Sequence, residues 1–280
     1  MKKISRRSFL AAAAVSAAAL ALTACGGSAS TASSAAASSV AASSEAASTS
    51  AAAAELTTVE AGKLTMATNA TFPPYEMTTD AGTIEGIDVD TAQAIAEKLG
   101  LELQIDDMDF DAALLSVQQG KADIAMAGVT VTDERKAVMD FSDSYATGIQ
   151  SIIVPEGSDI TSPDDLAGKK IGTQRGTTGY IYCSDDFGDD AVVAYDDGLT
   201  AVQALNNGQV DAVVIDNAPA KEFVAANPGL VILDTSYAEE DYAIGLAKGS
   251  ALEDAVNAAL EELKADGTLQ SNVDTYITAE

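Results

Sequence analysis

Residues 108–135 read MDFDAALLSVQQGKADIAMAGVTVTDER, and their pattern indicates a helix, a strand and a cation in close succession. We expect a helix at 111–119 that ends at Gly120, followed by a β-strand at 122–127. A run of small residues then leads to Arg135. A helix next to a strand is typical of a sheet covered by helices, so this segment favours an α/β fold.

The same alternation extends in both directions along the chain. The expected strands are at 63–67, 101–105, 170–173, 191–195 and 211–215. The expected helices are at 88–99, after Gly176, and at 198–206, 218–226 and 250–265. Strand–helix–strand repetition predicts parallel sheets covered by helices. A body of about 225 residues is large for one core and favours two lobes, with 148–154 and 242–247 as the strands that cross between them.

The first 24 residues have the pattern of an export signal. Two lysines and two arginines precede a largely apolar run at 9–24. Residues 22–25, LTAC, resemble a bacterial lipobox, which predicts cleavage before Cys25 and lipidation of that cysteine. The alternative is a retained membrane anchor, and SRRSFL is also compatible with twin-arginine export. Residues 26–55 are almost wholly Ala, Ser, Thr and Gly, so Cys25 is expected to begin a flexible linker over 25–55.

Composition excludes several classes of function. Without the four positive charges of 1–24, the chain has 11 Lys and Arg against 43 Asp and Glu, a net charge of −32. Such a field disfavours nucleic acid and anionic lipid as partners. Histidine is absent and Cys183 is the one cysteine besides Cys25, which excludes Ser-His-Asp and Cys-His nucleophiles and a Cys/His zinc cluster. We predict no catalytic residues, no metal and no cofactor, and place Cys183 on a helix as a partly buried residue.

Arginine is scarce: beyond the two in the leader, the chain contains only Arg135 and Arg175. The planar guanidinium can hold both oxygens of a carboxylate, which a lysine cannot do. We therefore expect Arg135 to bind a carboxylate of a small ligand. The alternative is an ion pair with Asp133 or Asp140. Arg175 is expected to be a solvent-exposed loop residue.

Two further positions lie where an α/β fold places ligands. Thr177 and Thr178 follow a predicted strand and begin a helix, whose free N–H groups attract anions. Asp216 ends the predicted strand at 211–215, at the carboxyl edge of a parallel sheet, where its carboxylate suits an ammonium group. The alternative for Asp216 is a helix N-cap, with Asn217 as a competing cap.

Six ordered blocks of this sequence closely resemble the extracytoplasmic solute-binding proteins of polar amino acid ABC importers, the group that contains glutamine-binding and lysine/arginine/ornithine-binding proteins. The blocks are ATNATFPPYE (67–76), GIDVDTAQAIAEKLG (86–100), the segment quoted first (108–135), DFSDSY (140–145), IGTQRGTTG (171–179) and VDAVVIDNAPA (210–220). The resemblance implies a two-lobe periplasmic-binding-protein, or Venus-flytrap, fold with two hinge strands. It places lobe 1 at 56–146 and 242–280, and lobe 2 at 147–241.

The resemblance also implies a role for individual residues. Arg135 would clamp the ligand carboxylate with the help of Thr130, and the Gly128 carbonyl would accept from the ligand ammonium. Phe72 and Phe110 would wall the side-chain pocket, although core packing explains aromatic residues equally well. Asn69 and Gln174 stand where relatives carry charged residues, and these two amides indicate a neutral, amide-lined pocket. Three carboxylates nearby, those of Glu76, Asp109 and Asp111, would instead suit a cationic ligand if they turned inward.

These observations predict a lipid-anchored, extracytoplasmic and monomeric receptor that is not an enzyme. It would bind a polar L-amino acid between its lobes and deliver it to an ABC permease in the membrane. The alternatives are an enzyme similar to the cyclohexadienyl dehydratases on the same fold, or the ligand-sensing partner of a signalling receptor. The particular amino acid is left open.

Overall fold

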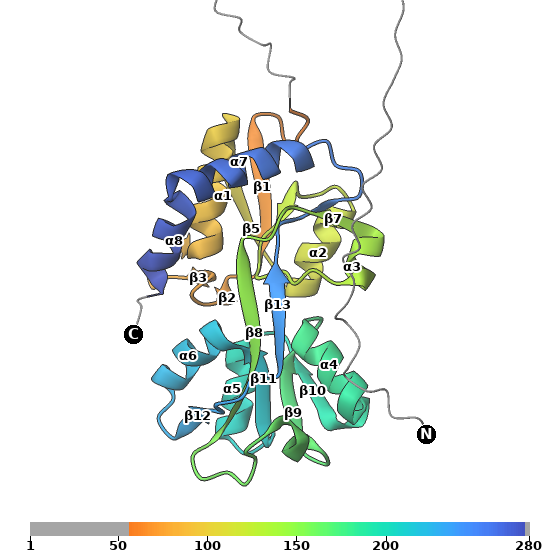
Figure 1. Ribbon diagram of the computed structural model, residues 1–280, viewed down its shortest axis with the longest axis vertical. Helices are drawn as coiled ribbons and strands as arrows, with labels where there is room; N and C mark the ends of the chain where they lie inside the picture. Colours follow the sequence, from red (N-terminus) through yellow and green to blue (C-terminus); the bar gives the residue numbers. More distant parts are fainter. Residues whose placement is uncertain (1–55, 278–280) are drawn as a thin grey trace, which may run out of the picture. The chain divides into compact units, whose positions relative to one another are not determined.

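A computed structural model describes residues 56–277 of the 280-residue chain. The predicted export signal at 1–24 and the segment 25–55 with Cys25 lie outside the described residues. Between residues 56 and 277, no helix has the length and apolar character needed to cross a membrane. These residues form two lobes, each built on its own β-sheet, and two strands run between the lobes (Figure 1).

The first lobe is built on a five-stranded sheet. In spatial order its strands are β5 (Glu102–Asp107), β1 (Lys63–Thr68), β6 (Ile124–Ala125), β14 (Gly245–Ala247) and β7 (Met139–Phe141). The strand β1 is parallel to β5 and β6, whereas β14 is antiparallel to β6 and β7. A small antiparallel sheet of β2 (Thr71–Phe72), β3 (Glu76–Thr78) and β4 (Ile84–Glu85) belongs to the same lobe. Because β14 comes from near the C-terminus, both ends of the described chain build this lobe.

Helices pack on both sides of this first sheet. They are α1 (Ile87–Leu99), α2 (Phe110–Gln118), α3 (Asp133–Val138), α7 (Glu253–Asp266) and α8 (Thr268–Tyr276). The helices α1, α7 and α8 pack against one another, and α2 packs against β1 and β14 (Figure 1). The helix α1 buries Val89, Ala92 and Ile95 and ends at Gly100, which adopts a left-handed conformation with φ 70°. The periodic apolar face and the glycine stop therefore act as the sequence pattern predicts.

The second lobe is built on a six-stranded sheet. Its strands in order are β10 (Val192–Tyr195), β9 (Ile171–Gln174), β11 (Ala212–Asp216), β8 (Ala146–Pro155) and β12 (Leu230–Ile232), with β13 (Ala238–Tyr242) also paired to β8. Its helices are η1 (Pro163–Leu166), α4 (Thr178–Phe187), η2 (Asp189–Ala191), α5 (Gly198–Asn206) and α6 (Asn217–Ala226). The expectation of purely parallel sheets is wrong, since β8 is antiparallel to β11, β12 and β13. Cys183 lies on α4, which confirms its expected place on a helix, but it is fully buried and not partly buried as expected.

Two antiparallel strands, β8 and β13, connect the lobes side by side (Figure 1). The expected strand at 148–154 lies within β8. The expected second crossing strand at 242–247 is wrong, because β13 ends at Tyr242 and β14 already belongs to the first sheet. The strand β13, AEEDY, has a period-2 pattern in which Glu240 and Tyr242 are buried and Glu239 and Asp241 are exposed. Because the segment carries three carboxylates and little apolar surface, this pattern gives only a weak signal for a strand.

Candidate functional site

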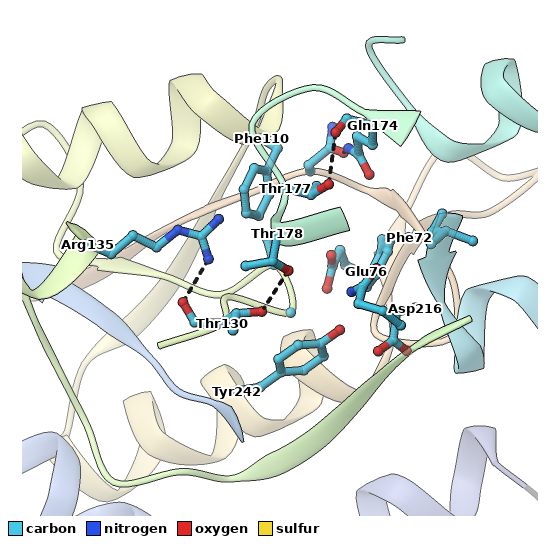
Figure 2. Close-up of a pocket in the computed structure, with 15 residues that line it drawn as sticks. Phe72, Glu76, Phe110, Thr130, Arg135, Gln174, Thr177, Thr178, Asp216 and Tyr242 are labelled. Atoms are coloured by element: carbon cyan, nitrogen blue, oxygen red, sulfur yellow. Dashed lines mark hydrogen bonds between the residues drawn. The ribbon is translucent and has the colours of Figure 1, made fainter. Parts of the chain in front are cut away.

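A pocket lies between the two lobes and contains about 400 Å³ of space not occupied by atoms. Part of this space is open to solvent. All ten residues that the sequence predicts to bind a ligand line it: Asn69, Phe72, Phe110, Gly128, Thr130, Arg135, Gln174, Thr177, Thr178 and Asp216. Figure 2 shows Arg135 and Asp216 on opposite sides of this cleft. Residues more than 100 positions apart in the chain thus converge on one site.

Arg135 is buried in the wall formed by α3, with 8% of its surface exposed. Its Nη1 donates to the Thr130 carbonyl at 2.7 Å, and its Nη2 donates to the Gly176 carbonyl at 3.1 Å (Figure 2 draws the first contact). The guanidinium also lies 5.3 Å from the centre of the Phe110 ring, within cation–π range. Burial lowers the pKa of Arg135, and the nearby Glu240 is the main influence that opposes this shift.

No carboxylate of residues 56–277 forms an ion pair with Arg135. The alternative that assigned Asp140 to it is wrong, because Asp140 pairs with Lys248 at 2.6 Å. Asp133 lies in the first turn of α3 without such a pairing. The hydrogen bonds of Arg135 go to two carbonyl groups, so no carboxylate of residues 56–277 contacts its guanidinium directly, and Glu240 acts on it only from a greater distance.

Asp216 ends β11, lines the pocket and caps the following helix. Its Oδ1 accepts from the Ala218 N–H at 3.0 Å, which makes it the N-cap of α6, and its Oδ2 accepts from the Ile149 N–H at 2.8 Å. Asn217 is not the cap, since its amide donates to the Ser151 hydroxyl. Burial raises the pKa of Asp216 to about 6, against the opposing effect of hydrogen bonds from Tyr242, Ala218 and Ile149. Among the described residues no lysine or arginine pairs with this carboxylate.

A carboxylate that sequence analysis missed joins the lobes at the cleft. Oε2 of Glu240, on β13, accepts from the hydroxyl of Thr130 at 3.2 Å, that of Thr178 at 2.9 Å and the amide of Gln150 at 3.0 Å. Thr130 belongs to the first lobe and Thr178 to the second, so their hydroxyl groups meet on the crossing strand. The period-2 alternation of AEEDY was the available signal, because it points Glu240 to the same face as Tyr242.

The two predicted amides meet each other across the cleft. Gln174 Nε2 donates to Asn69 Oδ1 at 2.8 Å, while Asn69 Nδ2 donates to the Met108 carbonyl at 2.9 Å. Next to them, Thr177 is the N-cap of α4 and donates its hydroxyl to the Gln174 carbonyl at 2.8 Å. Of these three hydrogen bonds, the one from Gln174 to Asn69 joins the two lobes, and the other two lie within a single lobe.

Aromatic rings cover the rest of the cleft. Phe72 stacks against Tyr75 with ring centres 5.9 Å apart, and Tyr75 meets Tyr242 edge-on at 5.4 Å. Tyr242 lines the cleft together with Glu76 and Gln150, which were not among the predicted ligand-binding residues. Of the three carboxylates considered for a cation, only Glu76 lines it, whereas Asp109 and Asp111 lie at a separate surface depression.

Arg175 stays outside the cleft and has a solvent-exposed position, as expected. Its side chain is 55% exposed, lies 3.5 Å from Asp196 and donates to the Ala194 carbonyl. The two arginines of the body therefore occupy opposite environments, and only Arg135 is buried at the pocket.

Comparison with known proteins identifies the family. Residues 64–279 match the model of the bacterial extracellular solute-binding proteins, family 3. The chain is 33% identical over 226 residues to the L-cystine-binding protein TcyJ of Escherichia coli K12, covering 79% of this chain and 85% of that protein. It is 32% identical over 230 residues to the arginine-binding extracellular protein ArtP of Bacillus subtilis 168, covering 78% and 87%.

Solved structures give the same assignment. An ancestral arginine-binding protein bound to glutamine superposes with a TM-score of 0.74 and 41% identity, covering 78% of this chain and 99% of that one. The arginine-, lysine-, histidine-binding protein ArtJ of Geobacillus stearothermophilus gives a TM-score of 0.75 and 34% identity, covering 78% and 96%. These matches confirm the expected two-lobe periplasmic-binding fold. The chain belongs to family 3 of the bacterial extracellular solute-binding proteins, whose curated relatives are amino-acid-binding proteins of ABC transporters.

Proposed function

We propose that this protein binds one polar L-amino acid in the cleft and delivers it to an ABC importer, without catalysing a reaction. The observation that carries the proposal is a pair of buried, unpaired opposite charges at one pocket. Arg135 meets no carboxylate and Asp216 meets no cation among residues 56–277. Burying a charge without a partner costs several kcal/mol, and an amino-acid zwitterion would neutralise both at once.

The ligand carboxylate would accept hydrogen bonds from the remaining N–H groups of the Arg135 guanidinium, with the Thr178 and Thr130 groups beside it. The ligand ammonium would donate to Asp216 and the Gly128 carbonyl. Supporting this orientation, Arg135 and Asp216 lie on opposite sides of the pocket (Figure 2), and Gly128 also lines the pocket. A bidentate contact between the guanidinium and the carboxylate would fix the orientation of the bound ligand in the cleft.

The ligand side chain would extend between Phe72 and Phe110 towards Asn69 and Gln174. Aromatic faces and amides suit a polar side chain, and the amides favour a neutral one. The curated relatives are named for cystine, arginine, histidine and glutamine, so the family accepts both neutral and cationic amino acids.

Ligand capture would close the lobes about β8 and β13, because the contacts of Gln174 with Asn69 and of Arg135 with Gly176 join one lobe to the other. We place the boundaries of the lobes at 56–146 with 242–280, and at 147–241. We further propose that the chain is cleaved before Cys25 and that Cys25 is lipidated. The Ala/Ser-rich segment 25–55 would then link the lipid anchor in the membrane to a monomeric, extracytoplasmic receptor.

The test is a thermal-shift panel on protein that begins at residue 26, refolded to remove carried-over ligand, with each of the twenty amino acids. A ligand at 1,000 times its Kd should add about 4 kcal/mol to the free energy of unfolding. One amino acid, or a small chemically related group, should raise the melting temperature. Absence of a shift with every amino acid would refute the proposal.

A further inference from the structure

Two carboxyl groups, Glu76 and Asp88, meet beneath the cleft, and both side chains are fully buried. The Asp88 N–H donates to the Tyr75 carbonyl at 2.9 Å, which ties the start of α1 to the residue before Glu76. The approach is close because residue 86 is glycine with φ 141°, and a Cβ there would lie 2.1 Å from the Tyr75 oxygen. With their backbones tied in this way, the two buried carboxyl groups act on each other, and each influences the pKa of the other.

The hydrogen-bond donors around the two groups are unevenly distributed. Asp88 Oδ2 accepts from the Gly128 N–H at 3.1 Å and from the Tyr145 hydroxyl at 2.8 Å. Asp88 Oδ1 and both oxygens of Glu76 receive no hydrogen bond from any N–H or hydroxyl group of residues 56–277. Three buried oxygens without a donor would be a large energetic penalty if both groups were ionised.

Among residues 56–277, no lysine or arginine pairs with either of these two acids. The titratable groups that act on the pair are Asp107, at the end of β5, and Tyr75 and Tyr145 from the adjoining loops. All of these are anionic or neutral. Two adjacent carboxylates with no cation between them cannot both remain ionised near neutral pH, because each disfavours the charge of the other.

We propose that Glu76 and Asp88 share a single proton in the folded protein, with the Glu76 hydroxyl donating to Asp88 Oδ1 and the charge remaining on Asp88. The proton belongs on Glu76 because two donors already stabilise charge on Asp88. One proton then provides a partner for Asp88 Oδ1 and for one oxygen of Glu76. The other Glu76 oxygen remains an acceptor at the wall of the cleft.

The pair is a positioning device for the cleft. Asp88 holds the N–H of Gly128, a residue of the cleft floor with φ 56°, and the hydroxyl of Tyr145, which directly precedes the crossing strand β8. Loss of the proton would place two negative charges under the cleft and weaken both attachments. This inference depends on the geometry of the first lobe and not on which ligand the cleft binds.

The pKa shifts agree with this arrangement. Burial, followed by the charge of Asp88, raises the pKa of Glu76 well above its ordinary value. Burial also raises the pKa of Asp88, to about 6, against the hydrogen bonds from Gly128, Tyr145 and Glu76. Since the folded protein holds the proton more tightly than the unfolded chain, its stability falls as the pH rises towards the folded pKa of Glu76.

Infrared spectroscopy of the ligand-free protein tests the shared proton directly. At about pH 8, ordinary carboxyl groups and Asp216 are ionised, so a C=O stretching band of a protonated carboxylic acid should come from Glu76. The band should persist in wild type and in the exposed control Glu261→Gln, and disappear in Glu76→Gln. Its absence from folded wild-type protein would overturn the proposal, whether or not the variant folds.

Thermal unfolding against pH gives the second readout. Glutamine at position 76 can donate an N–H to Asp88 Oδ1 at every pH and therefore imitates the protonated acid. The melting temperatures of wild type and Glu261→Gln should fall as the pH rises above neutral, whereas the melting temperature of Glu76→Gln should fall markedly less. An equal loss in all three proteins would contradict the proposal, and neither readout requires an amino acid to bind.

Discussion

The two charged ends of the cleft are built differently. Asp216 is held by the N–H groups of Ala218 and Ile149, which both belong to the second lobe. Arg135 is held by one carbonyl of its own lobe, Thr130, and by one of the opposite lobe, Gly176. The backbone contacts of the negative end therefore come from a single lobe, with the Tyr242 hydroxyl at the end of β13 as a further donor. The positive end, in contrast, takes one of its two carbonyl contacts from the opposite lobe.

This difference suggests an order of events. An amino acid would find a preformed acceptor for its ammonium group in the open protein, at the carboxylate of Asp216. Its carboxylate would then compete with the Gly176 carbonyl for the guanidinium as the lobes close. Glu240 would also favour closure, because its carboxylate accepts a hydrogen bond from one hydroxyl group of each lobe, Thr130 and Thr178.

Removal of the positive end should have the largest effect. Arg135→Ala would leave the ligand carboxylate buried without a cation, so affinity for the amino acid that responds in the thermal-shift panel should fall by about 3–5 kcal/mol. Arg135→Lys should recover only part of this loss because an ammonium group cannot form the bidentate contact. Isothermal titration calorimetry measures both variants. A loss below about 1 kcal/mol, the scale of an exposed ion pair, would remove Arg135 from the site.

Substitution of Asp216 separates its two roles. Asp216→Asn keeps an oxygen to cap α6 but loses the charge, so affinity should fall by about 1.5–3 kcal/mol while the ligand-free protein keeps most of its stability. Asp216→Ala should additionally lose about 1 kcal/mol of folding stability through the missing cap. Calorimetry and denaturant unfolding of the two variants provide the measurements. Equal affinities of wild type and Asp216→Asn would leave the residue with the capping role alone.

The pH dependence of binding should follow Asp216. Its pKa of about 6 in the ligand-free protein means that the carboxylate becomes protonated below this pH, and a neutral acid attracts an ammonium group less. Affinity should be constant from just above this pKa up to neutral pH and should weaken below it, by at most about tenfold, or 1.4 kcal/mol, per pH unit. Asp216→Asn should flatten this part of the profile. An affinity that rises as the pH falls would contradict the predicted ammonium contact.

The amide contact between the lobes should have the smallest effect. Gln174→Ala removes the hydrogen bond to Asn69, and ligand affinity should fall by about 0.5–1.5 kcal/mol because the closed state loses one net hydrogen bond. Arg175→Ala, next in the chain but exposed to solvent, is the matched control and should change affinity by well under 1 kcal/mol. A larger loss in the control than in Gln174→Ala would show that closure does not depend on the amide pair.

Much of the fold follows from local sequence patterns. The helix expected at 198–206 has those bounds in the structure, and Gly100 terminates α1 as its position predicts. The helix α8 was missed because TLQSNVDTY is mostly polar and buries only Leu269. The second crossing strand was misplaced for a related reason, since AEEDY is stabilised by pairing with β8 and not by apolar surface of its own.

The candidate site, like the fold, could be predicted only where residue type and local sequence decide the outcome. Residue type and resemblance singled out Arg135 and Asp216, which both line the pocket, because a zwitterion requires a cation and an anion. The sequence alone could not decide whether Asp216 caps a helix or contacts a ligand. The orientation of its carboxylate depends on the N–H groups of Ala218 and Ile149, which only the fold positions. Nor could it reveal that Glu76 is fully buried, because only the fold brings Asp88 against it.

A crystal structure with the amino acid identified by the thermal-shift panel tests the central claim most directly. We predict that the ligand carboxylate lies within hydrogen-bonding distance of the Arg135 guanidinium, and the ligand ammonium within the same distance of the Asp216 carboxylate. A ligand bound with its ends reversed, or in contact with only one of these two groups, would contradict the account.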